Sequence, residues 1–257
     1  GNPVLGNISA AEVEVTDAGG NVVQCASTAE DGSILLNVPK TAGSYTLKIK
    51  SRANNALLKA SLLNDINNNQ PYAISKSFTL VGNETSLNLG DIVAYARLSE
   101  SSQLEGGAFN ILKQIYLANN YIRTQTAQAS WVADKVTIYW KAGFNPYSYY
   151  GSANSLLSFY IPGQSKLYIL GGKDGNVSTI DTDHFDNSVI LHEYGHFLED
   201  IYGRSDSPGG SHNGDFIIDP RLAWSEGWAN FFQAAVQGTA FYLDTSGFCG
   251  DSVESGS

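Results

Sequence analysis

Hydrophobic and polar residues alternate in short stretches over the first 96 residues. Val13 and Val15 stand between Glu12, Glu14 and Thr16, which is the period of a half-buried strand. Turn-forming residues from Asp17 to Asn21 follow, and the pattern resumes at Val22. The same pattern predicts further short strands at 33–38, 45–49, 57–63, 72–80 and 87–95. Many short strands joined by turns predict a β-sandwich over residues 1–96.

The pattern changes near residue 97. Apolar residues recur at close to helical spacing over 108–123, and two further strands are expected at 136–140 and 166–170. A loop rich in Tyr, Ser and Gly lies between these strands, over 143–158. The chain is therefore expected to be multidomain, with an all-β sandwich over 1–96 followed by an α+β domain over 97–257.

A helix expected over 182–203 carries the sequence's strongest chemical signal. Thr182 or Asp181 would cap its start, and Gly203 would end it in the left-handed conformation. His192 and His196 lie four residues apart, so their imidazoles leave the same face and can reach one zinc ion. Together with Glu193 they form the H-E-x-x-H pattern, in which the glutamate is the general base.

Two histidines leave such a site incomplete, because catalytic zinc usually has three protein ligands. A second helix is expected from Pro220, with Asp219 as its cap and Gly238 as its end. Glu226 is the only acidic residue between Pro220 and Tyr242. An unpaired carboxylate on a mostly apolar helix would be costly to bury, so we expect it to bind the zinc. His212, in the glycine-rich segment 203–218, is the alternative third ligand.

The segments "HEYGH" (192–196) and "SEGWAN" (225–230) together resemble the gluzincin peptidases, the thermolysin-like branch of the zinc peptidases. The resemblance covers residues 181–237 and implies that residues 97–257 form a zincin-like metallopeptidase domain. It also implies that Glu226 is the third zinc ligand and that Asn230 orients His192. The 30 positions between His196 and Glu226 exceed the family's usual spacing, so an inserted loop is expected there.

Peptidases of this type also use a His or Tyr donor to stabilise the tetrahedral oxyanion. We assign this catalytic role to His212, and Tyr147, Tyr149 and Tyr150 are the other candidates. Two further residues of the expected helix have possible supporting roles. His184 would be solvent-facing or support a ligand, and Asp200 would be solvated or bond to a ligand imidazole.

The N-terminal region carries a second resemblance. "VEVTDAGGNVV", "STAEDGSILLNVP" and "AGSYTLKI" resemble the transthyretin-like, carboxypeptidase-regulatory-like modules over about half of residues 1–96. The resemblance implies a non-catalytic module that serves stability, spacing or adhesion.

Composition narrows the class of partner. The net charge is −10 with no Lys/Arg cluster, which argues against nucleic acid. Only 16% of residues are charged, a composition that we associate with secreted or cell-envelope proteins. No apolar run approaches the roughly 20 residues that span a bilayer. Cys25 and Cys249 are too far apart in sequence for their spacing to show whether they pair.

These observations predict a zinc-dependent peptidase acting on a peptide or protein substrate. An extended substrate would pair with the strand at 166–170. Two alternatives stay open: a non-proteolytic zinc hydrolase with the same site, and a binding or adhesion module with a vestigial metal site. The sequence gives no indication of oligomeric state.

Overall fold

The computed structural model describes residues 5–64, 68–96, 103–150, 155–210, 212, 217–246 and 252–254. Its helices are α1 (Glu105–Thr126), α2 (Asn187–Tyr202) and α3 (Pro220–Gln237), with a short 3₁₀ helix at Pro146–Tyr150. Its strands are β1 (Glu12–Asp17), β2 (Val22–Ser27), β3 (Gly43–Lys50), β4 (Arg52–Asn54), β5 (Lys59–Leu63), β6 (Ala73–Leu80), β7 (Val136–Tyr139), β8 (Phe159–Ile161), β9 (Lys166–Tyr168), β10 (Asp244–Ser246) and β11 (Ser252–Glu254).

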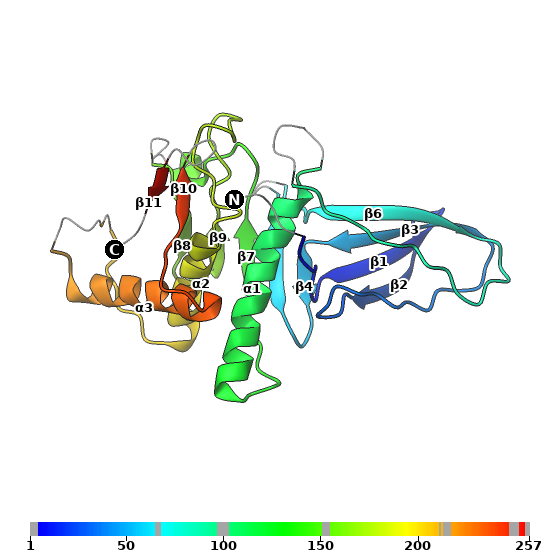
Figure 1. Ribbon diagram of the computed structural model, residues 1–257, viewed down its shortest axis with the longest axis horizontal. Helices are drawn as coiled ribbons and strands as arrows, with labels where there is room; N and C mark the ends of the chain where they lie inside the picture. The colour runs from blue at the N-terminus through cyan, green and yellow to red at the C-terminus, as the bar shows by residue number, and fades with distance from the viewer. Residues whose placement is uncertain are drawn as a thin grey trace.

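An antiparallel sheet in the order β2-β1-β3-β6 forms one end of the molecule (Figure 1). Its register pairs Val13 with Ile49 and Val15 with Leu47, and all four side chains are buried. The alternation seen in the sequence therefore lies on one apolar face, as the pleat of a strand requires.

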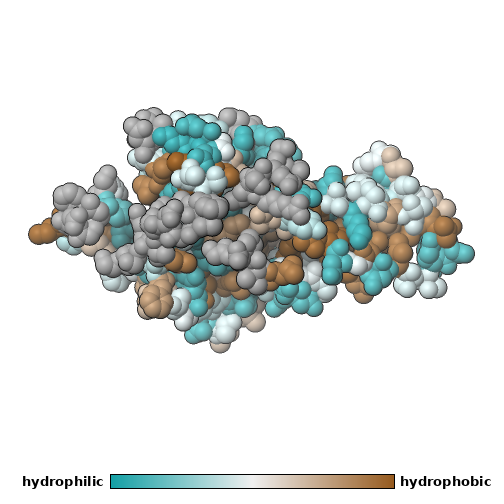
Figure 2. Space-filling model, turned by 45° about the horizontal axis from the view of Figure 1, so that its top comes forward, coloured by the Kyte–Doolittle hydropathy of each residue, from teal (hydrophilic) through white to brown (hydrophobic). Residues whose placement is uncertain are grey.

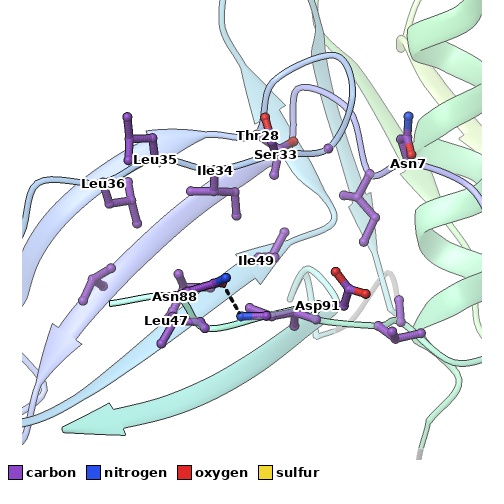
Figure 3. A pocket seen from close by; sticks show the side chains of 18 of the residues that line it. Asn7, Thr28, Ser33, Ile34, Leu35, Leu36, Leu47, Ile49, Asn88 and Asp91 are labelled. Atoms are coloured by element: carbon purple, nitrogen blue, oxygen red, sulfur yellow. Dashed lines mark hydrogen bonds between the residues drawn. The ribbon is translucent and has the colours of Figure 1, made fainter. Parts of the chain in front are cut away.

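Two extended segments, 33–40 and 84–96, cover this apolar face without forming strands. A cavity of about 1060 Å³ lies beneath them. Figure 3 shows Ile34 and Leu36 on one side of it and Leu47 and Ile49 on the other. Hydrophobic side chains also reach the surface at this end of the molecule (Figure 2), where Leu35 is 95% exposed. The strands predicted at 33–38 and 87–95 are thus absent, and the second layer of a sandwich is not formed.

The other large sheet of the molecule is mixed and has five strands in the order β4-β5-β7-β9-β8. β5 runs parallel to β7, and β7 runs parallel to β9, while β4 and β8 are antiparallel edge strands. α1 stands between the two sheets in Figure 1 and contacts both β5 and α2.

The predicted fold class, a β-sandwich followed by a separate zincin-like α+β domain, is wrong. β4 and β5 come from the first 96 residues, yet they pair into the sheet that holds β7, β8 and β9. One continuous core cluster runs from Val13 and Leu47 to Ile138 and Phe197. The described residues therefore form one unit of two sheets and three helices, because strand pairing joins both sides of residue 96. The division of the chain into domains at 1–96 and 97–257 is a separate matter, and it stays a prediction.

The helices follow the sequence with one exception. α1 contains the predicted 108–123 and continues for a few residues at each end. α3 begins with Pro220 behind an Asp219 cap and ends at Gly238, which has the left-handed φ of 67°. α2, in contrast, begins five residues later than expected, behind Asp186. Its end at Gly203 is extended, with φ −98° and ψ −153°, so the predicted left-handed cap is wrong.

No helix among the described residues is long and apolar enough to cross a membrane.

Candidate metal centre

The two histidines of H-E-x-x-H lie on α2, which packs against α3 (Figure 1). One helical turn separates them, and their Nε2 atoms lie 3.0 Å apart. His192 is 9% exposed, and the rest of α2 is anchored by buried apolar residues such as Ile190, Leu191 and Phe197. The buried stripe fixes the helix rotation, and this rotation directs both imidazoles to one point.

Glu226 completes a triangle of possible metal ligands. Its Oε2 lies 3.2 Å from His192 Nε2 and 3.6 Å from His196 Nε2. A tetrahedral zinc with bonds of about 2.0–2.1 Å separates its ligand atoms by about 3.3 Å. The observed spacings bracket that value, and two imidazoles with one carboxylate are a donor set typical of catalytic zinc. These residues fit the ion that the sequence implies.

A close helix crossing brings Glu226 to the histidines. A Cβ placed on Gly195 would lie 3.1 Å from Ala229 Cα, so glycine lets the two backbones approach. Trp228 Nε1 donates a hydrogen bond to Gly195 O at 3.0 Å and ties α3 to the same turn of α2. A glycine inside a helix costs about 1 kcal/mol relative to alanine, and this close approach accounts for its presence in α2.

Each imidazole has a hydrogen-bond partner on its far nitrogen. Asn230 Oδ1 lies 2.9 Å from His192 Nδ1, the contact that the family resemblance implied. His196 Nδ1 lies 3.2 Å from Ser225 Oγ, and this hydroxyl donates to Glu199 Oε2 at 2.6 Å. Such partners fix the ring orientation and the tautomer of a metal-binding histidine.

Asp200 and His184 do not take the supporting roles considered for them. Asp200 Oδ2 accepts from Tyr160 Oη at 2.6 Å and Gly163 N at 2.7 Å, so it holds the loop after β8. His184 precedes α2 and is 1% exposed, with its ring 5.0 Å from that of Trp140. Burial lowers the pKa of His184 to about 4, so this imidazole is neutral near pH 7. The late start of α2 explains the error, because it removes His184 from the helical face.

Electrostatic interactions within the triangle favour a negative charge on Glu226 and a positive charge on His196. Burial opposes ionisation of Glu226, but the hydrogen bonds and charges of His192 and His196 hold its pKa far below the usual range. Burial also opposes the charged form of His196, yet Glu226, Glu193 and Glu199 raise its pKa. The pocket thus stabilises positive charge at the point between the three ligand atoms.

Glu193 lies beside His192 on α2 and is 9% exposed. Burial is the main cause of the raised pKa of Tyr147 and of Tyr242, and the negative charge of Glu193 raises both pKa values further. The rings of Tyr242 and His192 are also nearly perpendicular, with centroids 5.9 Å apart at 87°. Both phenols therefore lie within electrostatic range of the Glu193 carboxylate.

The structure separates the remaining candidates. His212 Nε2 lies 3.3 Å from Glu226 Oε2, but His212 is outside the group of three mutually close ligands. Its side chain is 43% exposed. The Tyr149 ring is tilted against that of Phe144, with centroids 5.1 Å apart, and the Tyr150 side chain lies outside what the structure describes. Cys25 is an exposed free thiol, and Cys249 lies outside the described residues.

Sequence reasoning missed Tyr242, Ser225 and Glu199. Tyr242 lies in an irregular segment after α3, where no periodicity marks a functional side chain. Ser225 could have been found from its position next to Glu226. Glu199 could have been found because it lies one turn after His196, and i, i+3 pairs share a helix face.

Comparison with family models finds a match in the C-terminal part of this chain. The family model described as the Mycolysin C-terminal domain matches residues 119–253, which is more than half of the chain. The matched range contains the H-E-x-x-H segment and Glu226, and it supports a coarse link to the thermolysin-like zinc peptidases. Comparison with curated proteins finds no match.

Proposed function

We propose, from the premise that the chain belongs to the Mycolysin C-terminal domain family, that it is a zinc-dependent peptidase. His192, His196 and Glu226 are the proposed ligands. The observation that carries the proposal is the triangle of ligand atoms with sides of 3.0, 3.2 and 3.6 Å. Bound zinc would supply Lewis acidity, which polarises a peptide carbonyl and lowers the pKa of water.

Glu193 is the proposed general base. It takes a proton from the attacking water as the water oxygen forms a bond to the carbonyl carbon. The C–N bond then breaks, and Glu193 returns the proton to the leaving nitrogen. Its near-complete burial supports this role, because a carboxylate shielded from bulk water exchanges protons with the substrate and not with solvent.

His212 is the proposed donor to the oxyanion that forms during attack. Its Nε2 lies 3.3 Å from Glu226 Oε2 without belonging to the ligand triangle, and its Nδ1 lies 3.0 Å from Gly210 O. Because the carbonyl holds the Nδ1 proton, donation from Nε2 requires the protonated imidazole, and the substrate oxygen would replace Glu226 as its partner. Tyr147 and Tyr242 are the competing donors, because the charge of Glu193 reaches both.

The substrate is proposed to be an extended peptide or protein segment. The strand first considered for pairing, 166–170, contains β9, which is paired on both sides by β7 and β8. β8 is the edge strand beside β9 and contacts α2. We therefore propose that an extended chain pairs with the outer edge of β8. The family link also supports an extracytoplasmic location.

Zinc analysis combined with peptidase assays tests the proposal. We expect wild type to bind one zinc per chain and to cleave an unstructured protein such as casein. Glu226→Ala should lose zinc and activity, while Glu193→Gln should keep zinc and lose activity by about 10²–10⁴-fold, the usual range for a general acid–base group.

His212→Ala distinguishes the two assignments made for that residue. As an oxyanion donor, its loss lowers kcat and leaves zinc content unchanged. If Glu226→Ala kept its zinc while His212→Ala lost it, the ligand assignment would be wrong. Zinc binding with ester cleavage but no peptide cleavage would instead favour the non-proteolytic hydrolase, and failure of wild type to bind zinc would favour a vestigial site.

A further inference from the structure

The cavity above the sheet β2-β1-β3-β6 lies at the opposite end of the molecule from α3 (Figure 1). Its floor is the apolar face of that sheet, where Leu47 and Ile49 are buried. Its volume of about 1060 Å³ is close to the upper limit of the range of about 300–1,000 Å³ that is typical of small-molecule pockets. The proposed peptidase mechanism makes no use of this space.

The roof of the cavity presents apolar side chains to the sheet. Along the segment 33–40, Ile34, Leu36 and Val38 are half-buried, while the residues between them are exposed. This alternation is that of a strand, yet the segment pairs with none of the described strands. The second roof segment, 84–96, contributes further half-buried apolar residues. Floor and roof therefore meet the cavity with the same kind of side chain.

The roof is attached at its ends. Before the segment 33–40, Ala29 N donates to Ser33 O at 2.9 Å. After it, Tyr45 Oη donates to Thr41 O at 2.9 Å. The second roof segment is tied to α1 by a backbone hydrogen bond at its own end. These attachments hold the roof over the sheet, so the space between them is part of the folded architecture.

The chemistry of the walls selects an apolar occupant. A dry void of this volume would cost more than the stability of an ordinary domain, because the cost grows with volume. Water is a poor occupant, since each buried molecule needs two to four polar partners and the walls present Leu36, Leu47 and Ile49 (Figure 3). The roof segment 33–40 spans roughly 25 Å at the rise of an extended chain. Such walls suit a long aliphatic chain.

The end of the cavity next to α1 carries a positive charge. Lys113 of α1 lines the cavity, and a Cβ placed on Gly6 would lie 2.5 Å from its Nζ. Among the described residues, this ammonium group has no hydrogen bond or ion pair. Lys113 is half-buried, so its charge stands at the edge of the apolar walls and can pair with an anion there.

The other charged residues of the lining are compensated or exposed. Asp31 accepts a hydrogen bond from Ser33 N at 2.9 Å, and Glu84 accepts from two backbone N–H groups. Asp91 and Lys40 are exposed. The half-buried lysine on α1 is therefore the charge best placed to bind the polar end of a ligand.

We propose that this cavity binds a fatty acid, with the acyl chain between Leu36 and Leu47 and the carboxylate at Lys113. Burial of the chain supplies most of the affinity, in proportion to the apolar area that it removes from water. The ammonium group adds a weaker contribution and sets the direction of the ligand. The site is separate from the zinc centre and does not depend on the proposed peptidase function.

Titration of the zinc-loaded chain with laurate tests the inference. We expect calorimetry to give one laurate per chain and laurate to raise the melting temperature, because a ligand that binds only the folded state stabilises it. Leu36→Asp should bind laurate at least tenfold more weakly, since it places a charge against the acyl chain. Leu35→Asp is the matched control, because Leu35 is 95% exposed on the same segment, and it should bind as wild type does.

The carboxylate contact is tested with Lys113→Gln and with dodecanol, the uncharged alcohol of the same chain length. Lys113→Gln should weaken laurate binding by about two- to fivefold, the range expected for a partly exposed ion pair, and leave dodecanol binding unchanged. Asp91→Asn should bind laurate at least as tightly as wild type because it removes a negative charge from the lining. Unchanged laurate affinity in Lys113→Gln would exclude the assigned carboxylate contact.

Three further results would overturn the proposal. The first is the absence of stoichiometric laurate binding by wild type. The second is an equal loss in Leu36→Asp and Leu35→Asp, which would indicate adsorption to the surface. The third is co-sedimentation of wild type, but not of Leu36→Asp, with phosphatidylcholine vesicles, which would make the occupant a membrane lipid. Circular dichroism checks the fold of Leu36→Asp, and if it is unfolded, wild type and Lys113→Gln still decide. Zinc content should be unchanged in every variant.

Discussion

Asn230 Oδ1 lies 2.9 Å from His192 Nδ1, on the side of the imidazole opposite the nitrogen that faces Glu226. An amide oxygen accepts the ring proton without adding charge. The contact therefore selects the tautomer that leaves Nε2 free for a metal, while the net charge of the centre is set by Glu226 alone among these three residues.

Removing this acceptor should weaken zinc binding. We expect Asn230→Leu, which has a similar size, to lower zinc affinity by about 10–100-fold, because outer partners of metal ligands typically contribute this much. Asn230→Asp keeps an acceptor and should bind zinc at least as tightly as wild type. Competition with a chromophoric chelator measures both, and equal affinities for all three proteins would contradict the role.

The hydrogen bond from Ser225 to Glu199 should contribute to stability. Both residues are buried, so Ser225→Ala leaves the Glu199 carboxylate without its hydroxyl donor. We expect a loss of about 1–3 kcal/mol in the free energy of unfolding, the usual cost of a buried unsatisfied group. Urea denaturation of the two single variants and of Ser225→Ala/Glu199→Gln forms a double-mutant cycle, and additive losses would show that the two residues are not coupled.

The crossing of α2 and α3 can be tested with two glycines. Gly195→Ala should destabilise the protein by about 1–3 kcal/mol, because its Cβ would press on the backbone of Ala229 and overpack the contact. Gly227→Ala is the matched control on α3, where a Cβ would meet nothing within 4 Å. There the helix propensity of alanine should stabilise by about 1 kcal/mol. Thermal melts that rank the variants in the opposite order would contradict the crossing.

Tyr242 offers a test of the groups around Glu193. If its hydroxyl stabilises the oxyanion in place of His212, Tyr242→Phe should lower kcat by about 10²–10³-fold with zinc content unchanged. We expect the larger fall in His212→Ala and a smaller one in Tyr242→Phe, since the Tyr242 ring contact with His192 survives the change to Phe. Steady-state kinetics of the two variants on one peptide decide between them.

The Glu12 network should give an acid-dependent stability. Glu12 accepts hydrogen bonds from Arg52 and Lys50, and these bonds, with the Arg52 bond as the largest cause, lower the pKa of Glu12. Because the folded-state pKa is lowered, the stabilisation is present above the usual pKa near 4.5 and is lost as the pH falls through the folded value.

Glu12→Gln should therefore cost about 1 kcal/mol at pH 7, a value limited by partial exposure of the pairs. The difference from wild type should shrink below pH 4. Urea denaturation across this range measures it, with Asp174→Asn as a surface control, and a difference that does not change with pH would exclude the ionised carboxylate as the cause.

The local elements of this fold could be predicted from sequence because their signals are local. Turn residues and alternation located β1 and β3, and Asp219, Pro220 and Gly238 bounded α3 correctly. The sheet topology could not be predicted, since the pairing of β5 with β7 joins residues more than 70 positions apart and alternation carries no information about partners.

The candidate site shows the same division. The spacing of His192 and His196 follows from helical period, and the isolation of Glu226 in an apolar helix indicated a buried partner. The contact between Tyr242 and His192 depends instead on how the chain returns after α3. The sequence predicts Thr182 or Asp181 as the cap of this helix, but α2 begins behind Asp186 instead.

The parallel pairing of β5 with β7 also determines how the molecule would respond to a broken chain. A single cut between β6 and α1 would separate two fragments that still share a sheet and a core. The pieces should co-purify as a nicked but folded complex, and separating them would require a denaturant. Genetic removal of the first 96 residues, in contrast, would strip β7 of its neighbour and leave an aggregation-prone edge.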